Sequence, residues 1–201
     1  WLRCLIRDGI VKKENIILSV ARFDSPSHAK RQDVLIRAFG KFYLQQKDYR
    51  LILAGAVKGE GGKDYLSVLQ KEVGKLPIDI VPNPSFIELK KLYAKAKFFW
   101  HAAGYGIDET KEPEKVEHFG ITTVEAMSAS AIPVVINRGG QREIINSDAG
   151  YLCDSIEEMV SSTLSLINSS EKLKRISQNA VKRSKEFSVD EFEKKIPEII
   201  L

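Results

Sequence analysis

Cysteine and long apolar segments are scarce in this 201-residue chain. Its two cysteines, Cys4 and Cys153, show neither the spacing of a metal site nor the number that a disulfide framework needs, which is typical of a reducing compartment. No apolar run approaches the roughly 20 residues that a membrane span needs. The opening residues, WLRCLIRDGI, are too short and too interrupted by charge for a signal peptide. We therefore expect a cytoplasmic protein.

A strong excess of either charge is also missing. The 31 basic and 27 acidic residues give a net charge of +4, and the basic residues are spread among the acidic ones. This balance argues against a nucleic-acid partner, whereas peripheral contact with a membrane surface stays open. The sequence has no internal repeat, serine nucleophile elbow, His–carboxylate triad or metal-ligand cluster. We therefore expect no bound metal.

What the chain does have is a regular alternation of apolar runs and amphipathic segments. The apolar, β-branched runs predict buried strands at 16–21, 50–55, 78–81, 97–102, 132–136 and 150–153. Helical periodicity lies between them, at 30–42, 65–76, 88–96, 123–131, 142–145, 156–168, 171–185 and 190–200. This alternation predicts an α/β fold with a doubly wound parallel sheet, Rossmann-like, as one domain over 16–201. Residues 1–15 are interpreted as a linker or a truncated interdomain segment.

The stretch 117–135 is the most informative part of the sequence. Glu117 precedes the helix expected at 123–131, and Glu125 lies in its first turns. Gly120 lets backbone approach a ligand, and the free amides of a helix start favour an anion. Two carboxylates beside such amides suit a polyol that carries phosphate. The stretch equally fits a capping box between Thr122 and Glu125, with Glu117 a solvated loop acid.

Parallel strands end at one edge of a sheet, and ligands bind there. The loop after the first strand brings Arg22 and Lys30 to this edge, just before a helix, where two cations would favour a diphosphate. The alternative is a solvated loop with a surface lysine. Arg31 directly follows Lys30, so the position of the second cation is defined only to within one residue.

Two further loops reach the same region. The segment 59–62, GEGG, lacks the position and spacing of a dinucleotide fingerprint and is interpreted as a surface loop. The charged loop 103–116 follows His101 and contains Gly104 and Gly106. It is either a lid or acceptor-binding insert or a disordered surface insertion, and Tyr105 is the residue to mutate first.

These residues also carry a family resemblance. Glu117 and Glu125 with Phe119-Gly120 between them, followed by Pro133-Val134-Val135, Gly139-Gly140 and Glu143, resemble the nucleotide-sugar signature of retaining GT-B glycosyltransferases of group 1. The similarity is to the glycogen-synthase and lipopolysaccharide-mannosyltransferase-like family four and spans about residues 16–185. It implies the C-terminal donor-binding half of a GT-B fold, whose N-terminal acceptor-binding domain is absent here, so we expect this chain to be inactive alone.

The resemblance also implies a role for each matched residue. Glu117, Arg22 and Lys30 would be catalytic, and the donor-binding residues would be Glu125, Phe119, Gly120, Ile121, Gly139, Gly140, Asn83 and Pro84. The donor would be a UDP- or GDP-sugar, transferred with retention to an acceptor hydroxyl in polysaccharide, lipopolysaccharide or glycolipid biosynthesis, without metal or cofactor. The full enzyme could contact a membrane. Ala21, Ser130 and the long loop 103–116 depart from the family pattern.

Two other functions fit the predicted architecture. One is a non-catalytic nucleotide-binding or regulatory module, which would keep the same residues for binding alone. The other is a flavodoxin-like or epimerase domain, but that fold demands a glycine-rich first loop, and the loop after residue 21 has none.

Overall fold

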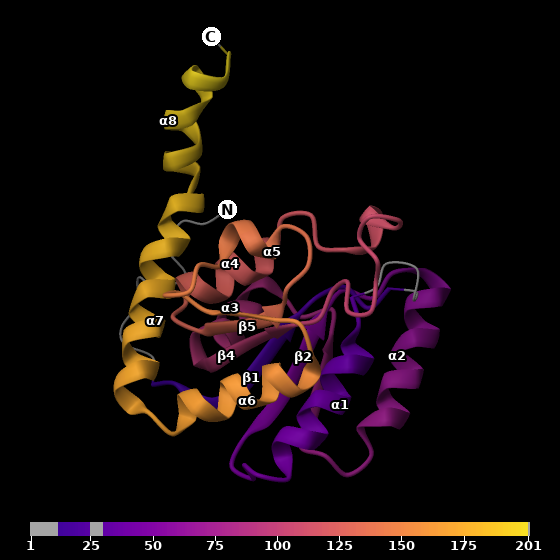
Figure 1. Ribbon diagram of the computed structural model, residues 1–201. Helices are drawn as coiled ribbons and strands as arrows, with labels where there is room; N and C mark the ends of the chain where they lie inside the picture. The colour runs from indigo at the N-terminus through magenta and orange to yellow at the C-terminus, as the bar shows by residue number, and fades with distance from the viewer. Residues whose placement is uncertain (1–11, 25–29, 201) are drawn as a thin grey trace.

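The computed structural model describes residues 12–24 and 30–200, and the parallel sheet at its centre confirms the expected α/β class (Figure 1). Within these residues, six strands form the sheet: β1 (Glu14–Val20), β2 (Arg50–Gly55), β3 (Ile78–Pro82), β4 (Ala96–His101), β5 (Ile132–Ile136) and β6 (Tyr151–Cys153). Neighbouring strands run parallel in the order β3-β2-β1-β4-β5-β6. The order reverses between β1 and β4, so the crevice for a ligand lies outside the carboxyl ends of these two strands.

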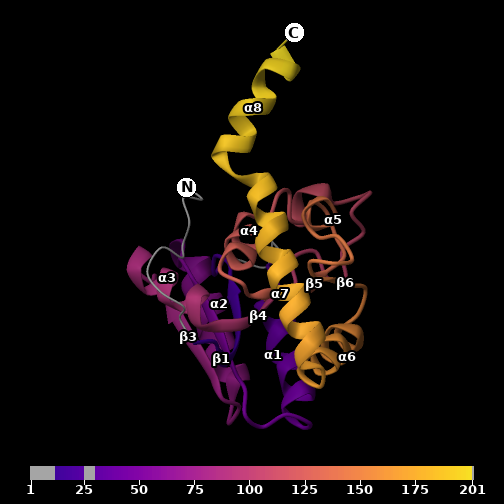
Figure 2. The ribbon, with the colours of Figure 1, turned by 90° about the vertical axis from the view of Figure 1, so that its left-hand side faces the viewer.

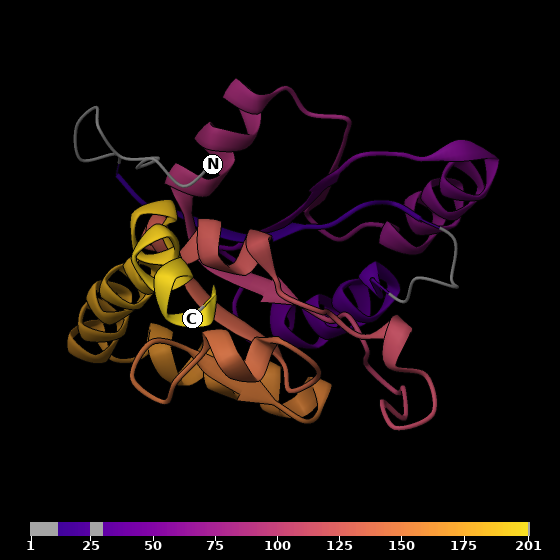
Figure 3. The same cartoon turned by 90° about the horizontal axis from the view of Figure 1, so that it is seen from above.

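Helices cover both faces of the sheet, which is why the strands are continuous apolar runs. One face is covered by α1 (Gln32–Tyr43), α2 (Gly59–Val73) and α6 (Ile156–Ile167). The other is covered by α3 (Phe86–Lys95) and α4 (Ile121–Ser128), with α7 (Ser170–Ser184) packed beside α4. Successive residues of β4 alternate between the two layers, since Phe98 and Trp100 join the first and Phe99 the second. In Figure 3, α3 (magenta) and α6 (orange) lie on opposite sides of the sheet.

The remaining elements are short or peripheral. Helix α5 (Gln141–Ile144) follows β5, and two 3-10 turns occupy Pro113–Lys115 and Lys185–Phe187. The last helix, α8 (Val189–Ile200), follows α7 and extends away from the sheet, as Figures 1 and 2 show.

One expected loop is helical instead. The segment 59–62, interpreted above as a surface loop, is the start of α2, which also ends three residues before the expected residue 76. Glycine is required at Gly62 because a Cβ there would lie 2.6 Å from the Phe23 carbonyl oxygen. The glycines therefore allow the helix to start close against the loop after β1, a tertiary contact that composition alone does not reveal.

The first strand begins two residues before the expected residue 16. Strand β1 starts at Glu14, and Lys13 donates hydrogen bonds from Nζ to the carbonyl oxygens of Tyr93, Ala96 and Ala129. These carbonyls lie at the carboxyl ends of α3 and α4, where backbone acceptors lack helical partners. Burial lowers the pKa of Lys13 to about 8. The linker interpretation for residues 1–11 lies outside the described residues.

Two glycine-to-alanine substitutions should have opposite effects on stability. In Gly55→Ala the new Cβ would meet the Ala21 carbonyl oxygen at 1.8 Å, so we expect a loss of about 3 kcal/mol in the free energy of unfolding. Gly40→Ala, inside α1, places its Cβ in ordinary contact with Leu76 at 3.6 Å and should gain about 0.5–1 kcal/mol. Urea denaturation measures both. A Gly55→Ala protein as stable as wild type would contradict this close packing of the loop after β1.

Candidate functional site

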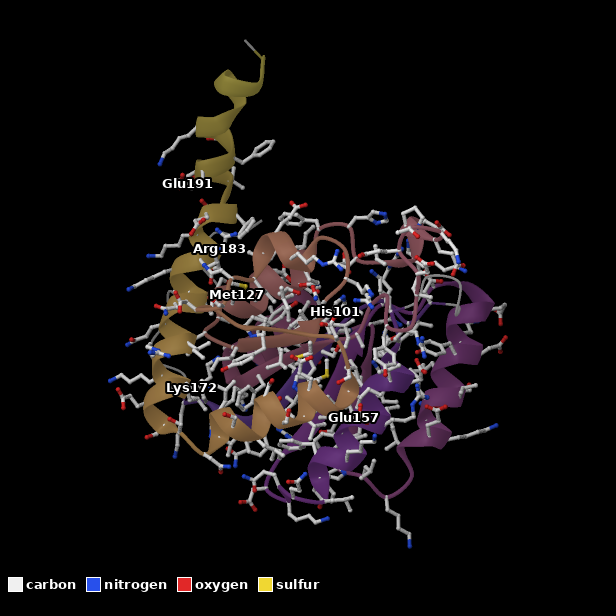
Figure 4. The ribbon with its side chains drawn as sticks, in the orientation of Figure 1. His101, Met127, Glu157, Lys172, Arg183 and Glu191 are labelled. Atoms are coloured by element: carbon white, nitrogen blue, oxygen red, sulfur yellow. The ribbon has the colours of Figure 1, made fainter. Side chains whose placement is uncertain are left out.

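A partly buried carboxylate with two nitrogen donors lies at the point where the strand order reverses. Glu117 Oε2 is 2.8 Å from Lys30 Nζ and 3.1 Å from His101 Nε2. His101 ends β4, Lys30 lies two residues before the start of α1, and Glu117 lies in the segment before α4. The structure thus joins two of the predicted catalytic residues. Figure 4 labels His101, near the centre of the molecule.

The surroundings of Glu117 keep it ionised. The side chains of Glu117 and Lys30 are 16% and 18% exposed, and that of His101 is 2% exposed. Burial alone would raise the pKa of the Glu117 carboxyl, but the hydrogen bonds and charges of His101 and Lys30 hold it well below its usual range. His101 was not among the predicted site residues. Its place at the end of a strand on the ligand edge is the signal that could have identified it.

Lys30 and Arg31, which the sequence could not separate, point to different partners. Arg31 has a left-handed backbone with φ 54° and closes on Asp33, with nitrogen–oxygen distances of 3.1 and 3.2 Å. Its Nη1 donates to the carbonyl oxygen of Tyr105 at 2.6 Å. Arg31 therefore binds groups of the protein that stabilise the fold, and Lys30 is the cation that contacts Glu117.

Three other predicted residues, Arg22, Asn83 and Pro84, are not members of this hydrogen-bonded cluster. Arg22 is 44% exposed, and its guanidinium is 3.9 Å from the Asp24 carboxylate. Asn83 and Pro84 follow the edge strand β3, separated from β1 by β2. Asn83 Oδ1 accepts the Val57 N–H at 2.8 Å, so this side chain ties two loops of the ligand edge together.

Glu125 does not cap its helix. Helix α4 begins at Ile121, two residues earlier than expected, with Gly120 at the N-cap and no side-chain cap bond. The capping-box hypothesis for Thr122 and Glu125 is therefore wrong. Tyr93 instead donates its hydroxyl to Glu125 Oε2 at 2.8 Å. Burial raises the pKa of the Glu125 carboxyl, an effect that the Tyr93 hydrogen bond opposes.

The start of α4 requires glycine. Gly120 has φ 95°, and a Cβ there would lie 2.9 Å from Gln141 Nε2 and 3.0 Å from Ile144 Cδ1. The residues on either side, Phe119 and Ile121, are 43% and 55% exposed. The Thr123 N–H donates to the Gly120 carbonyl at 2.9 Å, so the amides of the first turn before Thr123 are the ones that lack an intrahelical partner.

The Gly139-Gly140 turn lies against the backbone around Glu117. A Cβ on Gly139 would lie 2.3 Å from the Glu117 carbonyl oxygen, and one on Gly140 would lie 2.3 Å from that of His118. Both amides have protein partners: Gly140 N–H donates to the Glu117 carbonyl at 2.7 Å, and Gly139 N–H to Glu109 Oε2 at 3.0 Å. In this structure the turn therefore positions Glu117.

Glu109 holds this turn in place. Its carboxylate also pairs with Arg142 at 2.7 Å, and the Gly139 amide and Arg142 lower its pKa. Glu109 belongs to the loop 103–116, whose other end is bound to α1 through the Tyr105 carbonyl and Arg31. This insert therefore links the loop after β1 to the turn after β5. It is held by specific contacts, contrary to the alternative of a disordered insertion.

Neither a metal cluster nor a membrane helix is found in the described part of the chain. Within residues 12–24 and 30–200, no three His, Cys, Asp or Glu side chains are grouped so that they could hold a metal ion. None of the helices in these ranges combines the length and apolar character needed to cross a membrane.

The same Glu→Gln substitution should change stability in opposite directions at the two glutamates. At pH 7, Glu117→Gln should cost about 1–3 kcal/mol in the free energy of unfolding, because a paired carboxylate is lost and Lys30 keeps only a neutral partner. Glu125→Gln should be neutral or stabilising by up to about 1 kcal/mol, because it removes a buried charge.

The pH dependence of these effects follows from the two pKa shifts. The lowered pKa of Glu117 stabilises the folded state above the ordinary value near 4.5, so its advantage over Gln shrinks as the pH falls below that value. The raised pKa of Glu125 gives a penalty that appears as the pH rises through 4.5, so its gain from Gln disappears in acid. Urea denaturation from pH 3.5 to 7 tests both. The same pH dependence of the free energy of unfolding in both variants would contradict the different environments of Glu117 and Glu125.

Comparison with known proteins gives consistent matches. The family model described as glycosyl transferases group 1 matches residues 6–183. A GDP-Man:Man(3)GlcNAc(2)-PP-Dol alpha-1,2-mannosyltransferase from Yarrowia lipolytica is 31% identical over 120 residues, which cover 56% of this chain and 18% of that protein. The enzyme of the same name from Xenopus laevis is 29% identical over 195 residues, covering 90% of this chain and 37% of its own length. The chain thus spans about a third or less of these relatives.

Solved structures match the fold. The crystal structure of Anabaena Alr3699/HepE in complex with UDP-glucose superposes with a TM-score of 0.73 at 23% identity, covering 93% of this chain and 48% of that one. Its likeness supports the Rossmann-like architecture described above. Since the family model spans most of the chain, including every residue of the Lys30–Glu117–His101 cluster, this protein belongs to the group 1 glycosyl transferases.

Proposed function

We propose that this chain is the C-terminal, donor-binding half of a retaining GT-B glycosyltransferase of family four. The observation that carries the proposal is the 2.8 Å contact between Lys30 and Glu117 at the reversal of strand order. A cation for a diphosphate and a carboxylate for sugar hydroxyls are in direct contact there. The diphosphate of a nucleoside diphosphate sugar is bonded directly to the sugar. A site for this donor therefore places a cation for the phosphate close to a carboxylate for the sugar hydroxyls.

In the proposed complex, contacts with the donor replace the contact between Lys30 and Glu117. Lys30 binds the diphosphate, together with the exposed Arg22 and the first amides of α4. Glu117 accepts a hydrogen bond from a hydroxyl of the donor sugar, and Glu125 accepts from the ribose. Negative charge develops on the leaving diphosphate during transfer, and the fixed cations and amides stabilise it. Front-face attack by an acceptor hydroxyl then retains the configuration at the anomeric carbon.

The names of the relatives support a proposal for the donor and acceptor classes. The mannosyltransferases are named for GDP-mannose and a dolichol-linked acceptor, and the Anabaena structure contains UDP-glucose. We propose a GDP- or UDP-sugar donor and an acceptor hydroxyl of a glycolipid or polysaccharide. The relatives are about three times longer than this chain, which leaves room for an N-terminal acceptor-binding domain. The whole enzyme would act in the cytoplasm at a membrane surface, and this chain alone would transfer no sugar.

The chain should bind a nucleoside diphosphate without metal. Calorimetric titration with GDP and with UDP should give a dissociation constant in the micromolar to millimolar range, roughly −4 to −8 kcal/mol, for at least one of them. EDTA should leave this value unchanged, because cations of the protein neutralise the diphosphate. Binding that vanishes on chelation would contradict the metal-free account.

Removal of the Lys30 ammonium should weaken this binding selectively. Lys30→Met should cost about ten- to a hundredfold in nucleoside diphosphate affinity, since a charge-assisted hydrogen bond contributes roughly 1.5–3 kcal/mol. Lys63→Met is the matched control: Lys63 pairs with Glu60 at the exposed start of α2, and the substitution should leave affinity unchanged. Equal losses in the two variants would assign the effect to net charge.

The two glutamates should divide the donor between them. Glu125→Gln should weaken binding of the bare nucleoside diphosphate by roughly ten- to a hundredfold, through loss of a charge-assisted bond to the ribose. Glu117→Gln should spare the bare nucleotide and weaken the nucleotide-sugar, tested with GDP-mannose against GDP and UDP-glucose against UDP. Equal effects of both variants on the bare nucleotide would contradict this division.

A further inference from the structure

His101 has no role in the function proposed above, yet it is the most buried member of the cluster around Glu117. Its side chain is 2% exposed, and its ring stacks on Phe99 with a centroid distance of 6.2 Å and an interplanar angle of 17°. The His101 backbone pairs with Val135 of β5. Sheet and ring packing together give this imidazole a fixed position, whereas the Lys30 ammonium sits on a flexible four-carbon chain.

We infer that His101 is a positioning residue that holds the Glu117 carboxylate toward the donor sugar once Lys30 has turned to the diphosphate. The inference rests on the proposed function, because it assigns the sugar hydroxyl to Glu117. Glu117 Oε2 has two nitrogen partners in this structure, and donor binding recruits one of them, Lys30. His101 is the partner that stays.

The hydrogen-bond inventory fixes the direction of this contact. An ionised carboxylate only accepts, so His101 Nε2 carries the proton that it shares with Glu117. In the described part of the chain, His101 Nδ1 is buried without a hydrogen-bond partner. A purely structural histidine would place both nitrogens in bonds. Here only the nitrogen that faces Glu117 is used, which favours a role directed at that carboxylate.

The main chain of Glu117 needs no help from His101. The Gly140 N–H already fixes the Glu117 carbonyl at 2.7 Å, and Gly139 and Gly140 let the turn approach this closely. What stays adjustable is the carboxylate, whose partners are Lys30 and His101. Loss of the imidazole N–H should therefore affect the sugar contact more than the fold or the nucleotide contact.

Three substitutions separate the N–H from the shape of the ring. His101→Gln places an amide N–H at about the reach of Nε2, whereas His101→Asn carries its amide one bond short of Glu117. His101→Phe keeps a flat ring against Phe99 and has no donor. The control is His118→Gln, since His118 is adjacent to Glu117 in sequence but exposed.

The measurement is the ratio of two dissociation constants, that of the nucleotide-sugar over that of the bare nucleotide. Calorimetry with GDP-mannose and GDP, and with UDP-glucose and UDP, gives this ratio for each variant. We expect it to rise about tenfold in His101→Phe and His101→Asn, the loss of one hydrogen bond to a charged group. It should return to within about threefold of wild type in His101→Gln and stay unchanged in His118→Gln. Affinity for the bare nucleotide should change by less than about threefold.

Each other outcome is decisive. An unchanged ratio in His101→Phe overturns the inference, and so does an equal rise in His101→Gln and His101→Phe, because shape would then matter and the N–H would not. Equal weakening of both ligands assigns His101 to folding alone and also overturns it. If wild-type protein binds none of the four probes, the proposed function fails and the inference fails with it. Binding with an unaffected ratio leaves the proposed function standing.

Discussion

A carboxylate held in ionised form below the protein surface is the constraint on which the rest of this site depends. Glu117 is partly buried, and this burial opposes its charge, so it needs donors from elsewhere in the fold. Lys30 is 87 residues away in sequence and His101 is 16 away. The sheet places β1 beside β4, so Lys30, which follows β1, meets His101 at the end of β4. The strand order and the charge of one side chain are therefore linked.

The general architecture could be predicted from sequence because both of its signals are local. Apolar runs and helical periodicity located every strand, and the spacing of Glu117 and Glu125 pointed to the ligand edge. The errors arose where tertiary contacts override local pattern. The glycines of 59–62 suggested a loop, but the approach to Phe23 makes them a helix start. The role of His101 depends on a hydrogen bond across strands and loops, which no periodicity reveals.

The two glutamates show how one short segment creates two different environments. Glu117 lies before α4 with two nitrogen donors, and its pKa is lowered. Glu125 lies inside α4, where it accepts the Tyr93 hydroxyl and is partly buried, and this burial raises its pKa. The two carboxylates of one segment thus have opposite pKa shifts, because their hydrogen-bond partners differ.

The adjacent cations Lys30 and Arg31 show why residue type alone could not settle the site. Arg31 takes a left-handed backbone conformation at φ 54° just before α1, which turns successive side chains in different directions. Its planar guanidinium matches Asp33 and the Tyr105 carbonyl, and these bonds secure the insert to the helix. Lys30 is left to face Glu117. The insert is bound at its other end by Glu109 to Gly139, beside the backbone of Glu117. The contacts of Arg31 thus hold one end of the insert, and its other end braces the turn that positions the Glu117 carboxylate.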